Sequence, residues 1–87
     1  MNSDTLLRFP CDFPIKAMGL SNADFPDLVT EIVGRHAPDL DVSQTRVQSS
    51  RQGRYQSVTV TIRAQSREQL DAIYRDLSAA ERVVMAL

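Results

Sequence analysis

The sequence predicts one small α+β domain whose elements follow the order β-α-β-β-α-β. Its 87 residues fit a single domain. Apolar residues recur with a period of two in some segments and with helical spacing in others, and these segments succeed one another along the chain. No repeat, low-complexity tract or linker divides it, so we expect a flexible N-terminal arm over residues 1–10 and a single domain over residues 11–87.

Composition excludes several classes of protein. The hydrophobic share of 43% and the charged share of 24% are ordinary for a globular protein. The single cysteine, Cys11, excludes an internal disulfide and leaves no second thiol for a zinc site. The first residues lack a signal-peptide pattern, and no apolar run approaches the roughly 20 residues that span a bilayer. We therefore expect a cytoplasmic protein without a metal, a cofactor or a membrane contact.

A strand and a helix are predicted in the first half. Residues 11–18 alternate between apolar and polar side chains, which is typical of a half-buried strand. Pro14 lacks an N–H, so that position should face a sheet edge or a bulge. An apolar stripe from Phe25 to His36 predicts a helix, which Pro38 closes.

A hairpin follows. Residues 43–50 predict a polar strand, and residues 51–54 predict a turn in which Gly53 adopts positive φ. Residues 55–63 alternate β-branched and polar side chains, which strongly favours a second strand with one buried face.

The last elements are a helix and a short strand. Ser66 and Gln69 form a capping box, and an apolar stripe over residues 70–77 predicts the helix behind it. Residues 83–87 predict a final strand. Its inward residues are expected to be Val83, Met85 and Leu87, and its outward residues Val84 and Ala86.

This order leaves one face of the sheet bare. Two strand-helix-strand crossovers joined by a hairpin place both helices on one face of a four-stranded antiparallel sheet. Strand parity assigns polar, basic and modestly apolar side chains to the other face. The candidate partner-binding residues on that face are Lys16, Arg46, Tyr55, Thr59, Thr61 and Arg63.

Four segments carry a resemblance to a known family: FPCDFPIKAMG, the helix segment ending in VGRHAPD, SSRQGRYQSVTVTIRA and RVVMAL. In order and spacing they resemble the YbeD-like small proteins of Gram-negative bacteria, over residues 8–87. The resemblance implies a ferredoxin-like βαββαβ two-layer sandwich, similar to the ACT-type regulatory domains of amino-acid-metabolism enzymes. It implies a link to lipoate or amino-acid metabolism, but no activity and no catalytic residues.

Positive charge gathers in the predicted hairpin. Residues 42–67 hold five arginines and no acid, although the net charge of the chain is −1. Ser50, Arg51, Gly53 and Arg54 offer a hydroxyl, two guanidinium groups and turn N–H groups, which together suit a small anion. The alternative interpretation is that these arginines only keep an edge strand soluble.

Catalysis and nucleic-acid binding are disfavoured. His36, the one histidine, is interpreted as a helix-end residue whose charge favours the C-terminal dipole. Cys11 is interpreted as a small inward hydrophobe at a strand start. The sequence assembles no catalytic set around either residue. Tyr55 is the single aromatic on the bare face and the isoelectric point is about 5.7, which disfavours a nucleic-acid surface.

The sequence therefore predicts a non-catalytic regulatory or protein-interaction module. Its bare sheet face would bind a protein partner or a second copy of the chain. The alternative function is a sensor that binds a small anionic metabolite at the hairpin.

Overall fold

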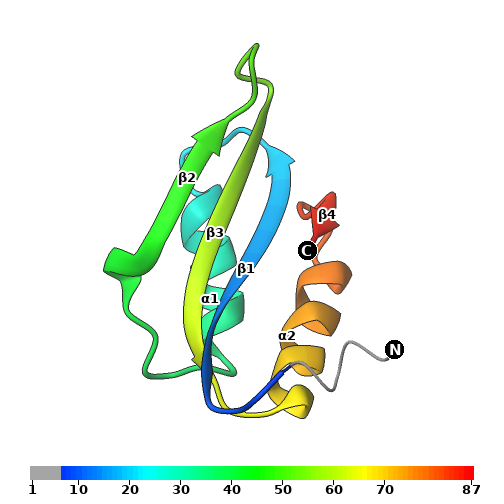
Figure 1. The fold of residues 1–87 in the computed structure, drawn as a ribbon. Coiled ribbons are helices and arrows are strands. Elements are labelled where there is room, and N and C mark those ends of the chain that lie inside the picture. Colours follow the sequence, from blue (N-terminus) through cyan, green and yellow to red (C-terminus); the bar gives the residue numbers. More distant parts are fainter. Residues whose placement is uncertain (1–6) are drawn as a thin grey trace.

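A four-stranded antiparallel sheet and two helices make up the fold, in a computed structural model that describes residues 7–87 (Figure 1). The elements are β1 (Cys11–Leu20), α1 (Phe25–Gly34), a short 3₁₀ helix η2 (Val42–Gln44), β2 (Thr45–Ser49), β3 (Tyr55–Ala64), α2 (Arg67–Ala79) and β4 (Met85–Ala86). The strand order is β2-β3-β1-β4, and α1 lies behind β3 and β1 in Figure 1. The predicted ferredoxin-like βαββαβ sandwich is confirmed.

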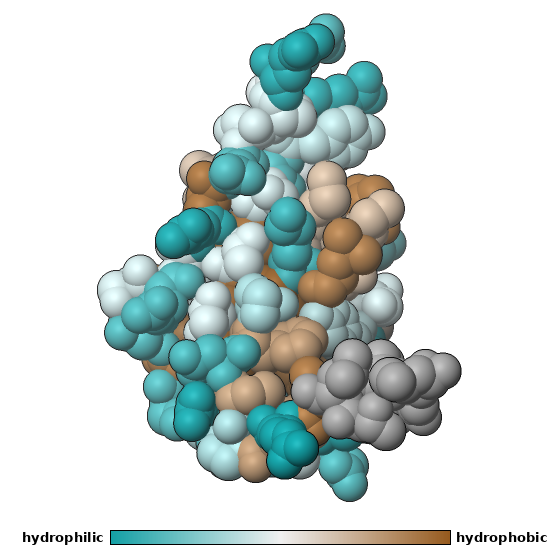
Figure 2. Space-filling model, in the orientation of Figure 1, coloured by the Kyte–Doolittle hydropathy of each residue, from teal (hydrophilic) through white to brown (hydrophobic). Residues whose placement is uncertain are grey.

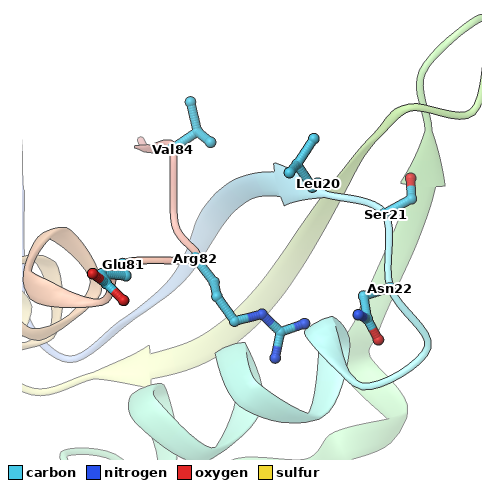
Figure 3. A pocket seen from close by; sticks show the side chains of 6 residues that line it. All are labelled: Leu20, Ser21, Asn22, Glu81, Arg82 and Val84. Carbon is cyan, nitrogen blue, oxygen red and sulfur yellow. The ribbon is translucent and has the colours of Figure 1, made fainter.

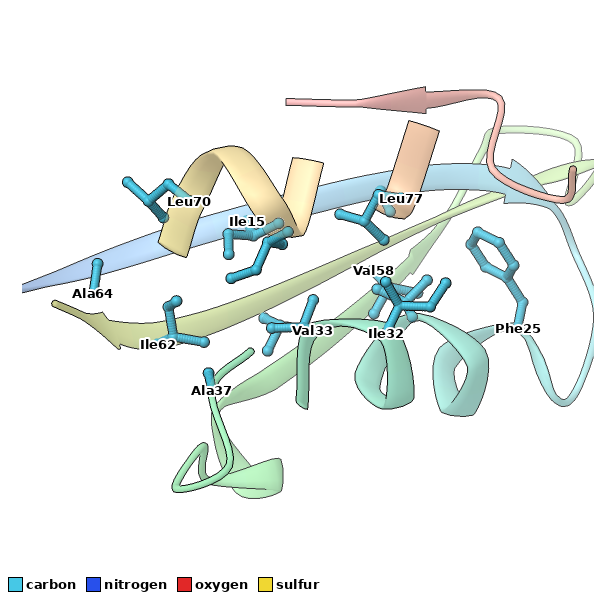
Figure 4. Close-up of a cluster of buried hydrophobic side chains, with 14 residues drawn as sticks. Ile15, Phe25, Ile32, Val33, Ala37, Val58, Ile62, Ala64, Leu70 and Leu77 are labelled. Atoms are coloured by element: carbon cyan, nitrogen blue, oxygen red, sulfur yellow. The ribbon is translucent and has the colours of Figure 1, made fainter. Parts of the chain in front are cut away.

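One cluster of buried apolar side chains joins the sheet to the helices (Figure 4). Alternate residues of β1 and β3, such as Ile15 and Val60, contribute from the sheet, and Phe25 and Ile73 contribute from the two helices. None of these four side chains is exposed to solvent. Burial of this kind contributes about 1.5–3 kcal/mol per large side chain, so this cluster is the main source of stability.

The N-terminal arm is partly described. Residues 1–6 of the arm predicted over residues 1–10 lie outside the described residues. Phe9 and Cys11 both pack against the core cluster. Within residues 7–87, no helix is long and apolar enough to cross a membrane.

Helix α1 begins as predicted but ends sooner. Pro26 occupies its first turn, and Asp24 precedes it without a side-chain capping bond. The α-helix ends at Gly34, and the chain continues in a turn through His36 rather than in helix up to Pro38. The Ala37 N–H still bonds to the Val33 carbonyl at 3.0 Å, so His36 lies in the turn directly after α1, close to the helix end at which the sequence placed it.

Helix α2 is capped as predicted at Ser66. The Ser66 hydroxyl accepts a hydrogen bond from the Gln69 N–H at 3.1 Å. The Gln69 side chain accepts from the Gln65 N–H at 2.7 Å and donates to the carbonyl of His36 at 2.8 Å. Gln69 thus fixes the start of α2 and also ties it to the turn after α1.

The second strand is shorter than predicted over residues 43–50. The Asp41 carboxylate accepts from the Ser43 N–H at 3.0 Å and caps a 3₁₀ turn over residues 42–44, so pairing with β3 begins only at Thr45. The Ser43 hydroxyl donates to the same carboxylate at 2.7 Å, and this bond, together with that of the N–H, lowers the pKa of the Asp41 carboxyl.

The side-chain alternation predicted for the last strand holds for Val83, which packs against the core, and for the exposed Val84, but it is wrong from Met85 onward. Ala86 lies opposite the buried Ala17 and packs against the core, whereas Met85 lies opposite Met18 on the bare face. The Met18 carbonyl also accepts from the Val84 N–H at 2.7 Å, so two successive residues face one residue of β1. Such a local insertion reverses the alternation beyond it.

Pro14 lies where its missing N–H does no harm. Lys16 of β1 directs its backbone toward Leu87: its N–H donates to the Leu87 carbonyl at 3.0 Å, and its carbonyl accepts from the Leu87 N–H at 2.8 Å. Pro14, two residues earlier on the same side, lies past the part of β1 that β4 pairs. The prediction that Pro14 faces an edge is confirmed.

Candidate functional site

The face of the sheet that the helices leave bare is a continuous candidate surface. Figure 2 looks onto it: hydrophilic residues dominate the hairpin and β2, and hydrophobic ones gather over β4 and the adjoining end of β1. Strand register arranges the side chains of this face in rows that cross the sheet.

One of these rows carries two cations. Thr59 of β3 lies opposite Arg46 of β2 on one side and opposite Lys16 of β1 on the other. We call these three residues the cationic row. Its two cations are separated by two strand spacings, about 10 Å. Within residues 7–87 neither Lys16 nor Arg46 forms an ion pair, so their charges are available to a ligand.

Small hydroxyl residues lie along the centre of the face. Ser57, Thr59 and Thr61 follow one another on the outer side of β3 and leave it shallow. A hollow of about 280 Å³ lies beside the Arg46 and Thr59 part of the cationic row. Its lining residues are Pro14, Ser43, Gln44, Arg46, Thr59 and Thr61. A guanidinium and three hydroxyls lining one hollow suit an oxygen anion such as a carboxylate.

An apolar region adjoins the cationic row. It consists of Met18, Leu20, Val84, Met85 and Leu87, and we call it the apolar edge. Leu20 is 56% exposed, Met85 50% and Leu87 63%. Clustered exposure of large apolar side chains next to paired polar rows is typical of an interaction surface.

The other predicted residues of this face are placed at its two ends. Arg63 pairs with Asp12 across the strands at 3.3 Å, so its charge is compensated. Tyr55 lies at the opposite end, where the Arg54 guanidinium lies 5.8 Å from the centre of its ring.

Some polar groups of the hairpin already form hydrogen bonds within the turn. Gly53 adopts a φ of 76°, as predicted, and its N–H donates to the Ser50 carbonyl at 2.9 Å. The Ser50 hydroxyl accepts from the Tyr55 N–H at 3.0 Å. Of the four residues predicted to bind an anion, Ser50 and Gly53 thus bond within the turn, whereas Arg51 and Arg54 are exposed and form no ion pair within residues 7–87.

A second hollow lies where β1 ends and β4 begins, with a volume of about 550 Å³ (Figure 3). Leu20 and Val84 point to the same side of it, and Arg82 reaches toward the start of α1. There the Arg82 guanidinium donates to the Asp24 carboxylate at 2.7 Å and lies 5.9 Å from the centre of the Phe25 ring.

Arg82 therefore has a structural partner. Its hydrogen bond holds the pKa of the Asp24 carboxyl below the usual range, and the same bond raises the pKa of Arg82. Glu81 adds a further negative charge to the hollow. This balance of charge does not favour an anion there.

His36 and Asp76 form a pair that joins the two helices. His36 Nε2 lies 2.6 Å from Asp76 Oδ2, and both side chains are partly buried. The bond with His36 lowers the pKa of the Asp76 carboxyl, with smaller contributions from the charges of Arg35 and Arg75. Catalysis by such a pair requires a third group. In the described part of the chain, no hydroxyl or thiol hydrogen-bonds to the His36 ring.

A metal site is not formed by the described residues. Residues 7–87 contain no group of three or more histidine, cysteine or acidic side chains that could hold an ion.

Comparison with known proteins places the chain in a family. Residues 4–87 match the family described as "Protein of unknown function (DUF493)". The chain belongs to this family. A UPF0250 protein of Nitrosomonas europaea is 47% identical over all 87 residues of both chains. A UPF0250 protein of Azotobacter vinelandii is 51% identical over 82 residues, which cover 93% of this chain and 89% of the relative. The resemblance to the YbeD-like family is thereby confirmed.

A solved structure supports the fold of this DUF493 protein. The solution structure of protein HP0495 from H. pylori matches all of the chain and 94% of its own length, with a TM-score of 0.70 and 15% identity. At that identity the likeness concerns the fold alone. The description of the family assigns no activity to it.

Strand parity predicted the polar members of the bare face but neither their grouping nor its apolar members Met85 and Leu87. Parity placed Lys16, Arg46 and Thr59 on it, whereas only the register aligns them in one row. The His36–Asp76 and Arg82–Asp24 pairs were missed, because 40 and 58 residues separate their partners and no local pattern marks them.

Proposed function

We propose that this DUF493 protein is a non-catalytic interaction module whose bare sheet face binds an acidic, partly apolar segment of another protein. The cationic row carries the proposal: two cations flank a threonine hydroxyl, and neither forms an ion pair within residues 7–87. A carboxylate above Thr59 would be within reach of both. Charge-assisted hydrogen bonds of this kind are about twice as strong as neutral ones.

The apolar edge favours a polypeptide partner. Met18 and Met85 form the row next to the cationic row, so one ligand spanning both rows needs a carboxylate and an apolar side chain a few ångströms apart. Protein segments combine these groups. Methionine side chains also adapt to varied apolar partners.

Nucleic acid fits this face less well. Tyr55 is its single aromatic residue, and it lies at the far end beside the hairpin rather than at the centre, where bases stack in sheets of this topology. The centre carries small hydroxyl residues instead.

The hairpin is assigned to the same partner rather than to a separate metabolite. The N–H of Gly53 and the hydroxyl of Ser50 already bond within the turn, so Arg51 and Arg54 would extend the positive surface without forming a closed anion cradle. The lone cysteine favours a reducing compartment, so we place this binding in the cytoplasm.

The test compares two double variants of equal charge. Immobilised wild-type protein, Lys16→Gln/Arg46→Gln and the control Arg35→Gln/Arg75→Gln are exposed to a Gram-negative bacterial extract, and the retained proteins are quantified. Isothermal titration then measures affinity for each retained protein. Loss of two charge-assisted contacts should weaken binding roughly tenfold or more for the face variant only.

Three outcomes would contradict the proposal. They are equal retention by all three proteins, salt-sensitive retention of the wild type on DNA resin, and stabilisation of the wild type by small anions in a thermal-shift panel without a protein partner.

A further inference from the structure

The outer edge of β2 presents backbone groups without partners. Ser50 donates its N–H to the Tyr55 carbonyl at 2.8 Å, which sets the alternation of the ladder with β3. Backbone groups of residues 46 and 48 therefore point toward β3, and those of Thr45, Val47 and Ser49 point outward. The Thr45 N–H bonds to the Val42 carbonyl. This leaves the N–H groups of Val47 and Ser49, and the outward carbonyls, free among the described residues.

The two sides of this edge differ chemically. Arg46 and Gln48 project from the bare face, and Arg46 has no acidic partner within residues 7–87. On the helix side Val47 is 46% exposed, and Val42, in the 3₁₀ helix just before β2, is 65% exposed. A strand laid along β2 would thus meet a cation on one side and apolar surface on the other.

The opposite edge of the sheet lacks this capacity. β4 has two residues, and only Ala86 directs its backbone groups away from β1. A single outward residue cannot anchor an added strand. Strand β2, by contrast, has five paired residues, and every second one, three in all, directs its backbone groups outward. Figure 1 shows β2 as the outermost strand on its side of the sheet.

We infer that β2 receives a second stretch of the same partner as a fifth strand, beside the stretch that lies on the bare face, and that this added strand alternates acidic with apolar residues. This inference rests on the proposed function and adds the binding geometry. Main-chain hydrogen bonds to Val47 and Ser49 supply affinity in such an arrangement, and the alternating side chains supply specificity. The acidic residues lie beside Arg46 and the apolar ones beside Val47, because side chains alternate between the faces of a sheet.

A second copy of this chain is a poorer occupant of the edge. Strand β2 contains one cation and no acid, so pairing two β2 strands would place both Arg46 side chains on one face with no carboxylate between them. The adjoining hairpins would add Arg51 and Arg54 from each copy. Like charges on neighbouring strands destabilise a sheet, whereas an acidic segment compensates them.

The experiment uses two sets of soluble octapeptides. In one set, glutamate or aspartate alternates with valine, isoleucine or leucine; in the other, the same residues are grouped with all acids at one end. Binding is measured by fluorescence anisotropy. The alternating set should bind roughly tenfold more tightly, because only it satisfies both sides of β2 while extended. Bound peptide should also slow hydrogen exchange at the Val47 and Ser49 amides.

The decisive variant is Val47→Pro, with Ser49→Pro as the second. Each removes one outward N–H and crowds an incoming strand while leaving the ladder with β3 intact, which edge positions tolerate. Circular dichroism checks that they fold. Each should weaken binding of the alternating peptides about tenfold, because each variant loses one main-chain hydrogen bond and the close contact around it.

The outcomes separate the inference from the proposed function. If Lys16→Gln/Arg46→Gln abolishes partner binding but both proline variants bind normally, the bare face binds its partner and strand addition is refuted. If the amide hydrogens of Val47 and Ser49 exchange slowly without peptide, in a protein that sediments as a dimer, then a second copy occupies the edge and the inference fails.

Discussion

The two faces of the sheet are built from the same strands, but one face packs against the helices and the other is exposed to solvent. On the helix side Ile15, Val58 and Val60 are fully buried, and the helices complete the core. On the bare side Lys16, Ser57 and Thr59, each one residue away along the chain, are partly exposed, and Lys16 forms no ion pair within residues 7–87. One face is therefore committed to stability, and the other is free for the recognition that we propose.

This contrast explains why the binding surface that we propose is flat rather than a deep pocket. An 87-residue domain buries only about 60–65% of the surface that its unfolded chain exposes. The core uses the helix side completely. A flat face and a free edge are what remains, and both suit an extended partner better than a small enclosed ligand.

The largest expected effect separates two neighbouring residues of β1. Ile15→Ala removes a buried side chain and leaves a cavity, so the free energy of unfolding should fall by about 2–5 kcal/mol. Lys16→Ala, one residue further on the bare face, should change it by less than about 0.5 kcal/mol. Urea denaturation measures both variants. Similar losses would show that the bare face also contributes to stability.

A smaller effect tests how closely the elements approach at the end of β1. A β-carbon on Gly19 would collide with the carbonyl oxygen of Arg82 and lie 2.7 Å from the Phe25 ring, so Gly19→Ala should cost about 1–3 kcal/mol. Gly34→Ala is the control: its β-carbon would meet only Leu40, at 3.5 Å, and should stabilise the protein by about 0.4–1 kcal/mol. Thermal denaturation distinguishes the two, and a tolerated Gly19→Ala would refute the close contact.

The smallest effect concerns the helix layer and depends on pH. The bond with His36 lowers the pKa of the Asp76 carboxyl in the folded state, so the folded protein binds fewer protons there than the unfolded chain. This stabilisation is complete above the unfolded pKa of about 3.9 and is lost as the pH falls through the folded value. Asp76→Asn should therefore lose stability less steeply below about pH 4 than the wild type.

Urea midpoints measured across the acidic range test this dependence. Asp71→Asn, which replaces an acid on the same helix that forms no ion pair among the described residues, should retain the wild-type slope. An unchanged slope in Asp76→Asn would mean that the His36 contact does not persist in solution.

Much of the fold was predictable because its signals are local. The alternation in β1 and β3, the capping hydroxyl of Ser66 and the positive φ of Gly53 each depend on a few consecutive residues. The errors arose where local and long-range preferences differ. The sequence around β4 alternates as a regular strand would, yet the pairing with β1 accommodates an extra residue at Val84, so the Met85 side chain points outward.

The sequence by itself determined the order of elements and which residues of β1 and β3 face away from the core, because period and turn chemistry are written in neighbouring residues. Only the tertiary structure decided that Lys16, Thr59 and Arg46 share one row, since register depends on how three separate strands are packed. It also decided that the edge of β2 stays open while that of β4 is almost absent. Both depend on contacts between distant segments, which the pattern within a segment does not specify.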